Sequence, residues 1–165
     1  MPFREFDVNV KPAVLFVCLG NICRSPLAEE AFRREAARIG LDAEVDSAGT
    51  GDWHIGRAPD PRAQAVAVRN GANIAHLRAR QVTPDDFRRF THIIALDTQN
   101  LADLEALRPA DGTASLSLLL DHLPGREGQA VADPYYGEDA GFDITWREVT
   151  EATAALAREI AAARR

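Results

Sequence analysis

Four short, mostly apolar runs recur along the chain, and segments with apolar residues at helical spacing lie between them. The runs occupy residues 14–18, 43–47, 92–96 and 115–118, and their length and composition predict strands. Helices are predicted over residues 26–39 and 61–70. A short helix is predicted from the start signal at residues 83–86 through residue 90, and two more run from about residue 98 to before Pro109 and from residue 142 onward. Strands that alternate with helices in this way favour a doubly wound α/β sheet.

The last predicted helix has the clearest periodic pattern, and its apolar stripe is expected to pack on the sheet. The stripe consists of Phe142, Trp146, Val149, Thr153, Leu156 and Ile160. Ligands of a doubly wound sheet bind beyond the carboxyl ends of its strands, so residues at those ends are candidates for chemistry. Cys18, Ser47 and Asp97 lie at predicted strand ends.

The first predicted strand leads into a loop with the sequence Cys-Leu-Gly-Asn-Ile-Cys-Arg, residues 18–24, here named the cysteine loop. Ser25 and Pro26 then fit the N-cap and the first residue of a helix. The backbone N–H groups of such a loop and the positive end of a helix together form a cradle for an anion. The cysteine loop is therefore predicted to bind an oxyanion.

The two ends of the cysteine loop carry reactive side chains. A thiolate is a strong nucleophile, and a helix N-terminus and a nearby cation both stabilise one, as expected for Cys18. Arg24 offers a planar fork of donors that holds two oxygens of a phosphate at once. A cysteine and an arginine separated by five residues therefore suit attack on phosphorus.

Hydrolysis of a phosphomonoester also needs an acid that protonates the leaving oxygen. The long segment of residues 121–141, rich in glycine and proline, offers Asp133, which precedes Pro134. Tyr135 and Tyr136 follow, and both suit the flanks of an aromatic substrate. The alternative is that Asp133 only begins a turn, the commoner role of an isolated Asp-Pro pair.

Composition and charge exclude several classes of protein. A chain of 165 residues with 46% apolar and 27% charged residues suits one globular domain. The net charge of −6 gives no general attraction to nucleic acid or to an anionic membrane surface. No run has the length of a membrane span, and the N-terminus lacks the pattern of a secretory signal, so a cytoplasmic location is expected.

The chain has two cysteines, and both lie in the cysteine loop. Two are too few for a disulfide framework, so their placement points to chemistry. Cys18 and Cys23 have no cysteine or histidine partners at the spacing of a zinc site. No metal and no cofactor are therefore expected.

Residues 17–26, Val-Cys-Leu-Gly-Asn-Ile-Cys-Arg-Ser-Pro, resemble the signature of the low-molecular-weight protein tyrosine phosphatases. Further segments resemble landmarks of that family in the same order, at residues 47–50, 53–54, 80–83, 96–97 and 133–137. The resemblance implies a single domain with a four-stranded parallel sheet and helices on both faces. Residues 13–165 are interpreted as that domain and residues 1–12 as an N-terminal extension.

The resemblance also implies a mechanism and a substrate. Cys18 would attack phosphorus and form a phosphocysteine, Arg24 would hold the equatorial oxygens, and Asp133 would donate a proton and then activate water. The substrates would be phosphotyrosine-containing proteins. The oligomeric state stays open between a monomer and a weak dimer.

The same resemblance implies that Asn21, Ser25, Ser47 and His76 hold the cysteine loop in shape, with Ser25 also bonded to the thiolate. The alternatives are a helix cap for Ser25, a turn residue for Asn21 and an ordinary structural histidine for His76. The remaining residues of the expected phosphate site and its walls are Leu19, Gly20, Ile22, Cys23, Trp53, Tyr135 and Tyr136.

Two of these residues have alternative roles. Cys23 is either a small filler of the loop or the partner that captures oxidised Cys18 in a disulfide. Trp53 either lines the cleft or packs as an ordinary, partly buried aromatic residue. No chemical role is assigned to His54.

Other functions of this kind of loop are disfavoured by particular residues. Related arsenate reductases relay oxidation through a cysteine outside the loop, and this chain has none. Related arginine phosphatases tend to carry a small polar residue at the position of Ile22, whose apolar side chain favours a phenyl phosphate. A non-enzymatic phosphate-binding module would be expected to lose Cys18, Arg24 or Asp133. The loop also lacks the second glycine and the Lys-Ser/Thr ending of a nucleotide P-loop.

Overall fold

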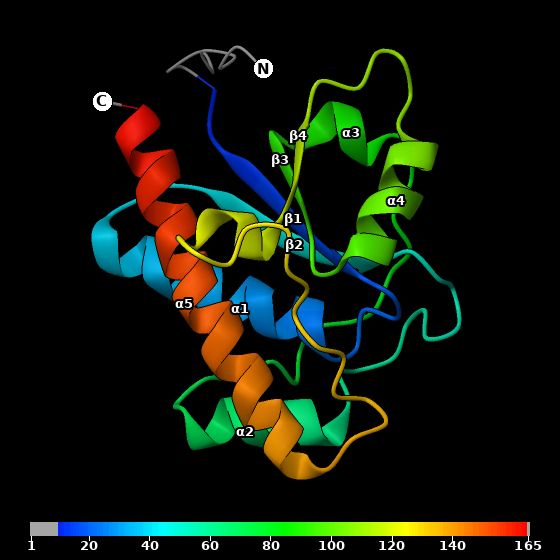
Figure 1. The fold of residues 1–165 in the computed structure, drawn as a ribbon, viewed down its shortest axis with the longest axis vertical. Helices are drawn as coiled ribbons and strands as arrows, with labels where there is room; N and C mark the ends of the chain where they lie inside the picture. The colour runs from blue at the N-terminus through cyan, green and yellow to red at the C-terminus, as the bar shows by residue number, and fades with distance from the viewer. Residues whose placement is uncertain (1–9, 165) are drawn as a thin grey trace.

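A central sheet with helices on both faces forms the body of the molecule (Figure 1). The computed structural model describes residues 10–164. The strands are β1 (Ala13–Cys18), β2 (Glu44–Gly49), β3 (His92–Ala95) and β4 (Ser115–Leu118). The helices are α1 (Arg24–Ile39), α2 (Pro61–Arg69), α3 (Asp86–Arg89), α4 (Thr98–Leu107), the 3-10 helix η1 (Leu119–His122) and α5 (Asp139–Ala163).

All four strands are parallel and lie in the order β2-β1-β3-β4. This order confirms the predicted doubly wound, four-stranded sheet of a single domain. The chain passes from β1 to β2 on one side and later returns to β3 on the other, so the order reverses between β1 and β3. A doubly wound sheet binds its ligand at the carboxyl ends of the strands beside such a reversal, where β1 ends at Cys18 and Asp97 follows β3.

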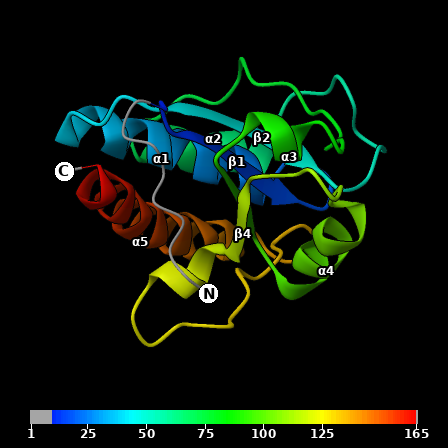
Figure 2. The same ribbon diagram turned by 90° about the horizontal axis from the view of Figure 1, so that it is seen from above.

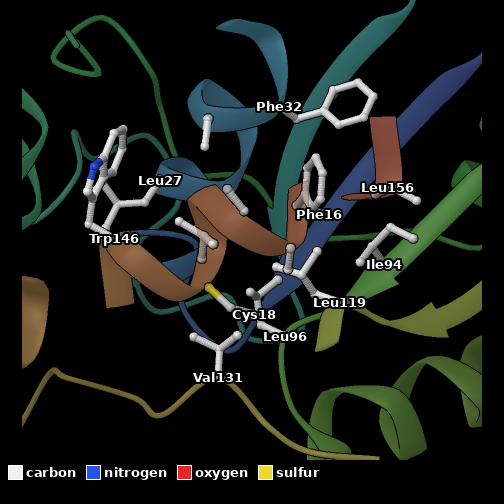
Figure 3. Packing of buried hydrophobic residues seen from close by; sticks show 14 of the residues in the cluster. Phe16, Cys18, Leu27, Phe32, Ile94, Leu96, Leu119, Val131, Trp146 and Leu156 are labelled. Carbon is white, nitrogen blue, oxygen red and sulfur yellow. The ribbon is translucent and has the colours of Figure 1, made fainter. Parts of the chain in front are cut away.

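The helices pack on the two faces of the sheet in separate groups (Figures 1 and 2). Helices α1, α2 and α5 share one buried cluster, which includes the predicted stripe of α5. Helices α3 and α4 cover the other face through Phe87 and Leu104. Figure 3 shows Cys18 within the first cluster, near Leu96 and Val131. The nucleophile candidate is thus anchored in the core.

Two predicted boundaries near the cysteine loop were wrong. Helix α1 begins at Arg24, so Ser25 is not its N-cap; Cys23 holds that position and makes no side-chain cap bond. The physical reason is that the Ser25 hydroxyl is bonded to the cysteine loop instead of to the helix backbone. Strand β2 continues to Gly49 because Ala48 and Gly49 pair with the end of β1, so Ser47 lies within the strand.

The predicted N-terminal extension, residues 1–12, falls mostly outside the described residues. Among residues 10–164, no helix combines the length and the apolar character that crossing a membrane requires.

Candidate active site

Cys18 lies at the carboxyl end of β1, and only 3% of the residue is exposed. Its Sγ lies 3.0 Å from Ser25 Oγ, and the backbone N–H of Asn21 donates to it across 3.3 Å. Ser25 Oγ already accepts a bond from the Asn21 side chain, which leaves its own hydrogen free to point at the sulfur. Two hydrogen-bond donors are therefore aimed at the sulfur.

Asn21 holds the cysteine loop in its shape. Its φ of 57° lies in the left-handed region, and it is the only residue other than glycine with positive φ among residues 10–164. Its Nδ2 donates to Ser25 Oγ at 2.8 Å and to Ser47 Oγ at 2.9 Å, and its Oδ1 accepts from the backbone N–H of Arg80 at 3.0 Å. Asn21 thus joins the loop, α1, β2 and the segment before α3.

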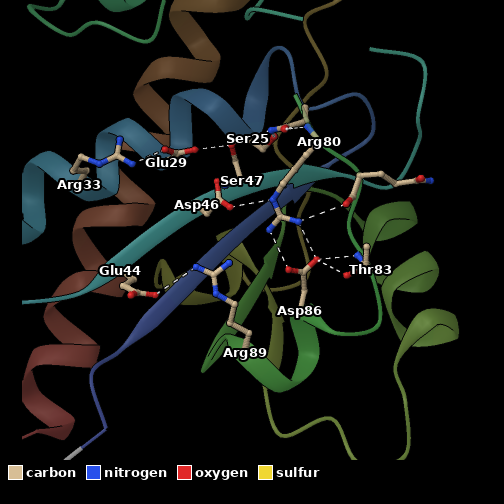
Figure 4. Close-up of polar contacts among 12 residues, drawn as sticks. Ser25, Glu29, Arg33, Glu44, Asp46, Ser47, Arg80, Thr83, Asp86 and Arg89 are labelled. Carbon is tan, nitrogen blue, oxygen red and sulfur yellow. Dashed lines mark hydrogen bonds and ion pairs between the residues drawn. The ribbon is translucent and has the colours of Figure 1, made fainter. Parts of the chain in front are cut away.

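Glu29 is a buried carboxylate beneath this network, and only 2% of the residue is exposed. Ser47 Oγ donates to its Oε1 at 2.7 Å, and Arg33 pairs with its other oxygen (Figure 4). Burial raises the pKa of Glu29, and the bonds from Arg33 and Ser47 act in the opposite direction. The sequence reasoning missed Glu29 because a Glu and an Arg four residues apart are typical of an exposed helix face.

An Asn21→Ala substitution is expected to destabilise the protein by about 4 kcal/mol. It removes three side-chain hydrogen bonds, each worth about 1 kcal/mol, and places alanine in the left-handed region. Urea unfolding measures the change. Asn21→Gly is the matched control, expected to recover about 1 kcal/mol because glycine adopts this φ freely. Equal stability of the two variants would show that the backbone at residue 21 is not strained.

Arg24 is nearly fully buried beside the cysteine loop. Its Nη1 donates to Asp97 Oδ2 at 2.6 Å and to the carbonyl of Val131 at 3.1 Å. Burial acts to lower the pKa of Arg24, but the negative charges of Cys18 and Asp97 outweigh it, so the pKa is raised. The guanidinium is therefore charged and fixed, with the end of β3 as one of its anchors.

Asp133 reaches the same place from the segment of residues 131–138, here named the acid loop. Its Oδ2 lies 3.5 Å from Arg24 Nη2, and 37% of its side chain is exposed. Its Oδ1 accepts the backbone N–H of Tyr135 at 3.0 Å, which orients the carboxylate. The Arg62 side chain donates to the carbonyls of Tyr135 at 2.8 Å and Gly137 at 3.3 Å. Helix α2 thus holds the acid loop through the side chain of Arg62.

The mouth of the site is apolar and aromatic. Leu19, Trp53, Tyr135 and Tyr136 all expose more than a third of their surface there. The rings of Tyr135 and Tyr136 meet edge to face, with centroids 4.9 Å apart. His54, which the sequence reasoning set aside, packs against Gly20 so closely that a Cβ at residue 20 would lie 2.9 Å from its ring. Its ring centroid also lies 6.5 Å from that of Tyr135, so His54 belongs to this mouth.

The structure does not bring His76 into the network that holds the cysteine loop. His76 is exposed, and no hydrogen bond joins it to that loop within the described part of the chain. The physical reason is that the acceptor and the donors of the Asn21 side chain are already paired with Arg80, Ser25 and Ser47. The role of His76 was predicted from a weak local match between this part of the sequence and the family pattern.

Cys23 is buried within the cysteine loop. Burial, together with the negative charge of Asp60, raises the pKa of its thiol, so Cys23 is a neutral thiol at pH 7. Its redox partnership with Cys18 stays a prediction. Ile22 is partly buried and packs against the main core cluster. Within residues 10–164, no group of three or more His, Cys, Asp or Glu side chains is arranged to hold a metal ion.

Comparisons with known proteins agree with the fold. The sequence model of the family described as "Low molecular weight phosphotyrosine protein phosphatase" matches residues 13–165. A relative of that description from Schizosaccharomyces pombe is 40% identical over 151 residues, which cover 90% of this chain and 96% of the relative.

Two solved structures extend the match. A protein tyrosine phosphatase from Entamoeba histolytica, crystallised with Hepes in its active site, has a TM-score of 0.87 and 31% identity over 92% of this chain and 98% of its own. A Drosophila arginine phosphatase has a TM-score of 0.83 and 31% identity over 89% of this chain and 96% of its own.

The fold and the cysteine loop define a phosphomonoester hydrolase of the protein tyrosine phosphatase class. Within that class, the chain belongs to the low molecular weight phosphotyrosine protein phosphatase family.

Proposed function

We propose that the protein hydrolyses phosphotyrosine in proteins through a phosphocysteine formed on Cys18. The observation that carries this proposal is the convergence of three groups from distant parts of the chain. The Cys18 sulfur lies beneath the cysteine loop, Arg24 is charged and fixed beside it, and the Asp133 carboxylate lies 3.5 Å from Arg24. Nucleophile, phosphate clamp and acid thus surround one space.

The first step is transfer of the phosphoryl group to sulfur. The Cys18 thiolate forms a bond to phosphorus while the bond from phosphorus to the phenolic oxygen breaks. Asp133, protonated at this stage, gives its proton to that oxygen, which leaves as a neutral phenol. Arg24 and the backbone N–H groups of the cysteine loop stabilise the charge on the three equatorial oxygens.

The second step releases phosphate. The Asp133 carboxylate takes a proton from a water molecule, whose oxygen attacks phosphorus while the bond from phosphorus to sulfur breaks. The Cys18 thiolate leaves, and the donors from Ser25 and the Asn21 backbone stabilise its charge. Asp133 ends the cycle protonated, as it began.

The choice of phosphotyrosine is supported by the side chains around the mouth. Trp53, Tyr135 and Tyr136 offer aromatic surfaces to a phenyl ring, and Ile22 is apolar. Phosphoarginine is the second candidate, because an arginine phosphatase is among the similar structures. A guanidinium between aromatic rings would also be bound well, so substrate comparison is needed to separate the two.

We expect phosphotyrosine peptides to be hydrolysed at least about 100-fold faster, in kcat/KM, than phosphoserine or phosphoarginine peptides of the same sequence. Phosphoserine lacks the aromatic ring that the side chains of Trp53, Tyr135 and Tyr136 would contact and position. Phosphate release, measured in parallel for the three peptides, tests this expectation, and the Cys18→Ser variant reports contaminating activity. Faster release from phosphoarginine would contradict the proposed substrate while leaving the cysteine chemistry in place.

A further inference from the structure

A second recess, here named the side cleft, lies beside the cysteine loop and has a volume of about 260 Å³. Leu19, the residue after Cys18, forms one wall, and Trp53 stands at the other side. The floor includes Gln81 and Val82, and α4 closes the cleft with Asp103 and Leu107. None of the three proposed catalytic side chains lines it, but Leu19 and Trp53 also belong to the mouth of the phosphate site, so the side cleft adjoins that mouth.

The floor of the side cleft is built by backbone pairing. The Gly49 N–H donates to the Arg80 carbonyl at 2.8 Å, and the Val82 N–H donates to the Gly49 carbonyl at 2.9 Å. The Gln81 side chain adds a bond to the Thr50 carbonyl at 3.1 Å. A cleft whose floor is fixed in this way needs little rearrangement to accept a ligand.

The lining of the side cleft carries negative charge and no positive charge. Asp103 is its only charged lining residue. One carboxylate oxygen of Asp103 accepts from Gln99 Nε2 at 3.0 Å, and no ion pair to Asp103 is found within residues 10–164. Asp52, which lies between the lining residues Gly51 and Trp53 in the sequence, is exposed. The remaining walls include the side chains of Leu19, Leu107 and Trp53.

A cleft lined by the apolar side chains of Leu19 and Leu107 and by the carboxylate of Asp103, which forms no ion pair in the described part of the chain, suits a long side chain with an aliphatic stem and a cationic head. Lysine and arginine have this form, since their methylene groups pack on apolar surface while the charged end reaches a polar partner. The indole of Trp53 also offers a face for a guanidinium or an ammonium group. A glutamate in the same place would meet Asp103 with like charge.

We propose that the side cleft binds a lysine or arginine side chain of the substrate peptide, within a few residues of the phosphotyrosine. This proposal rests on the proposed function, because it needs a phosphopeptide bound at the cysteine loop. Leu19 borders both places, and each residue of an extended peptide advances about 3.3 Å. The side cleft is therefore a specificity subsite for basic residues.

The test uses phosphotyrosine peptides with alanine flanks, in which one arginine is moved through the three positions on each side. At the preferred position, arginine is compared with norleucine and glutamate. We expect kcat/KM of the arginine peptide to exceed that of the norleucine peptide about three- to five-fold, in the range of a partly exposed ion pair. The advantage should shrink at high salt, where such a pair is screened.

Asp103→Asn should reduce the ratio of arginine to norleucine peptide to near one, and a general change in activity cancels from this ratio. Glu105→Gln is the matched control, an exposed acid of α4 that does not line the side cleft, and it should keep the ratio. Phosphotyrosine peptides that are hydrolysed without an arginine preference would overturn the subsite alone, as would a preference that survives Asp103→Asn. Failure of every phosphotyrosine peptide would overturn the proposed function and the subsite together.

Discussion

A Cys18→Ser variant is expected to lose hydrolysis of aryl phosphates by at least roughly 10⁴-fold, the scale of removing a covalent nucleophile. Serine nearly keeps the size of the side chain but remains a neutral hydroxyl at the end of β1, and a neutral hydroxyl is a much weaker nucleophile than a thiolate. Steady-state release of p-nitrophenol from its phosphate ester measures the loss.

Binding should survive this substitution, because Arg24 and the loop backbone are unchanged. Calorimetric titration of the Cys18→Ser variant with inorganic phosphate is expected to give measurable affinity. The matched control is Cys23→Ser, which alters the other cysteine of the same loop and is expected to retain turnover. A Cys18→Ser protein that hydrolysed substrate at a comparable rate would rule out the phosphocysteine.

Asp133→Ala is expected to slow hydrolysis by on the order of 10²–10⁴-fold for substrates with basic leaving groups. A strongly basic phenolate leaves slowly unless an acid protonates it, whereas the weakly basic anion of an acidic phenol leaves almost as readily without a proton. The loss should therefore grow with the pKa of the leaving phenol. Rates for a series of substituted phenyl phosphates, compared between the wild type and the variant, give this dependence.

The matched control is Glu138→Gln, five residues further along the acid loop, where the side chain is exposed and makes no cap bond to α5. It should behave like the wild type across the whole series. If Asp133→Ala slowed the hydrolysis of all the phenyl phosphates equally, another group would have to be the acid, and Asp133 would only position the acid loop.

The parts of the fold and the site that could be predicted are those that a pattern in the neighbouring sequence indicates. Four apolar runs and the periodic stripe of α5 were enough for the doubly wound sheet, and the cysteine loop was recognisable from its spacing alone. Asp133 is different, because its sequence neighbours also fit a plain turn. Family resemblance selected it, and the structure places it 3.5 Å from Arg24.

The misses have physical causes that lie in tertiary structure. Ser25 looked like a helix cap because serine before proline has that preference, but its hydroxyl is bonded to Cys18 and Asn21. Glu29 looked like an exposed residue of α1, and only the approach of Ser47 from β2 makes it part of the site. His54 lies in the recognised landmark at residues 53–54 but was given no chemical role, because its packing against Gly20 comes from the path of the loop after β2.

The two anchors of Arg24 Nη1 have a consequence for the timing of the cycle. One anchor, Asp97, follows a strand of the rigid sheet, but the other is the carbonyl of Val131, where the acid loop begins. An outward swing of that loop at Val131 would withdraw the proton donor and loosen the grip on phosphate in one movement. Such a movement would couple the release of inorganic phosphate to the withdrawal of the acid.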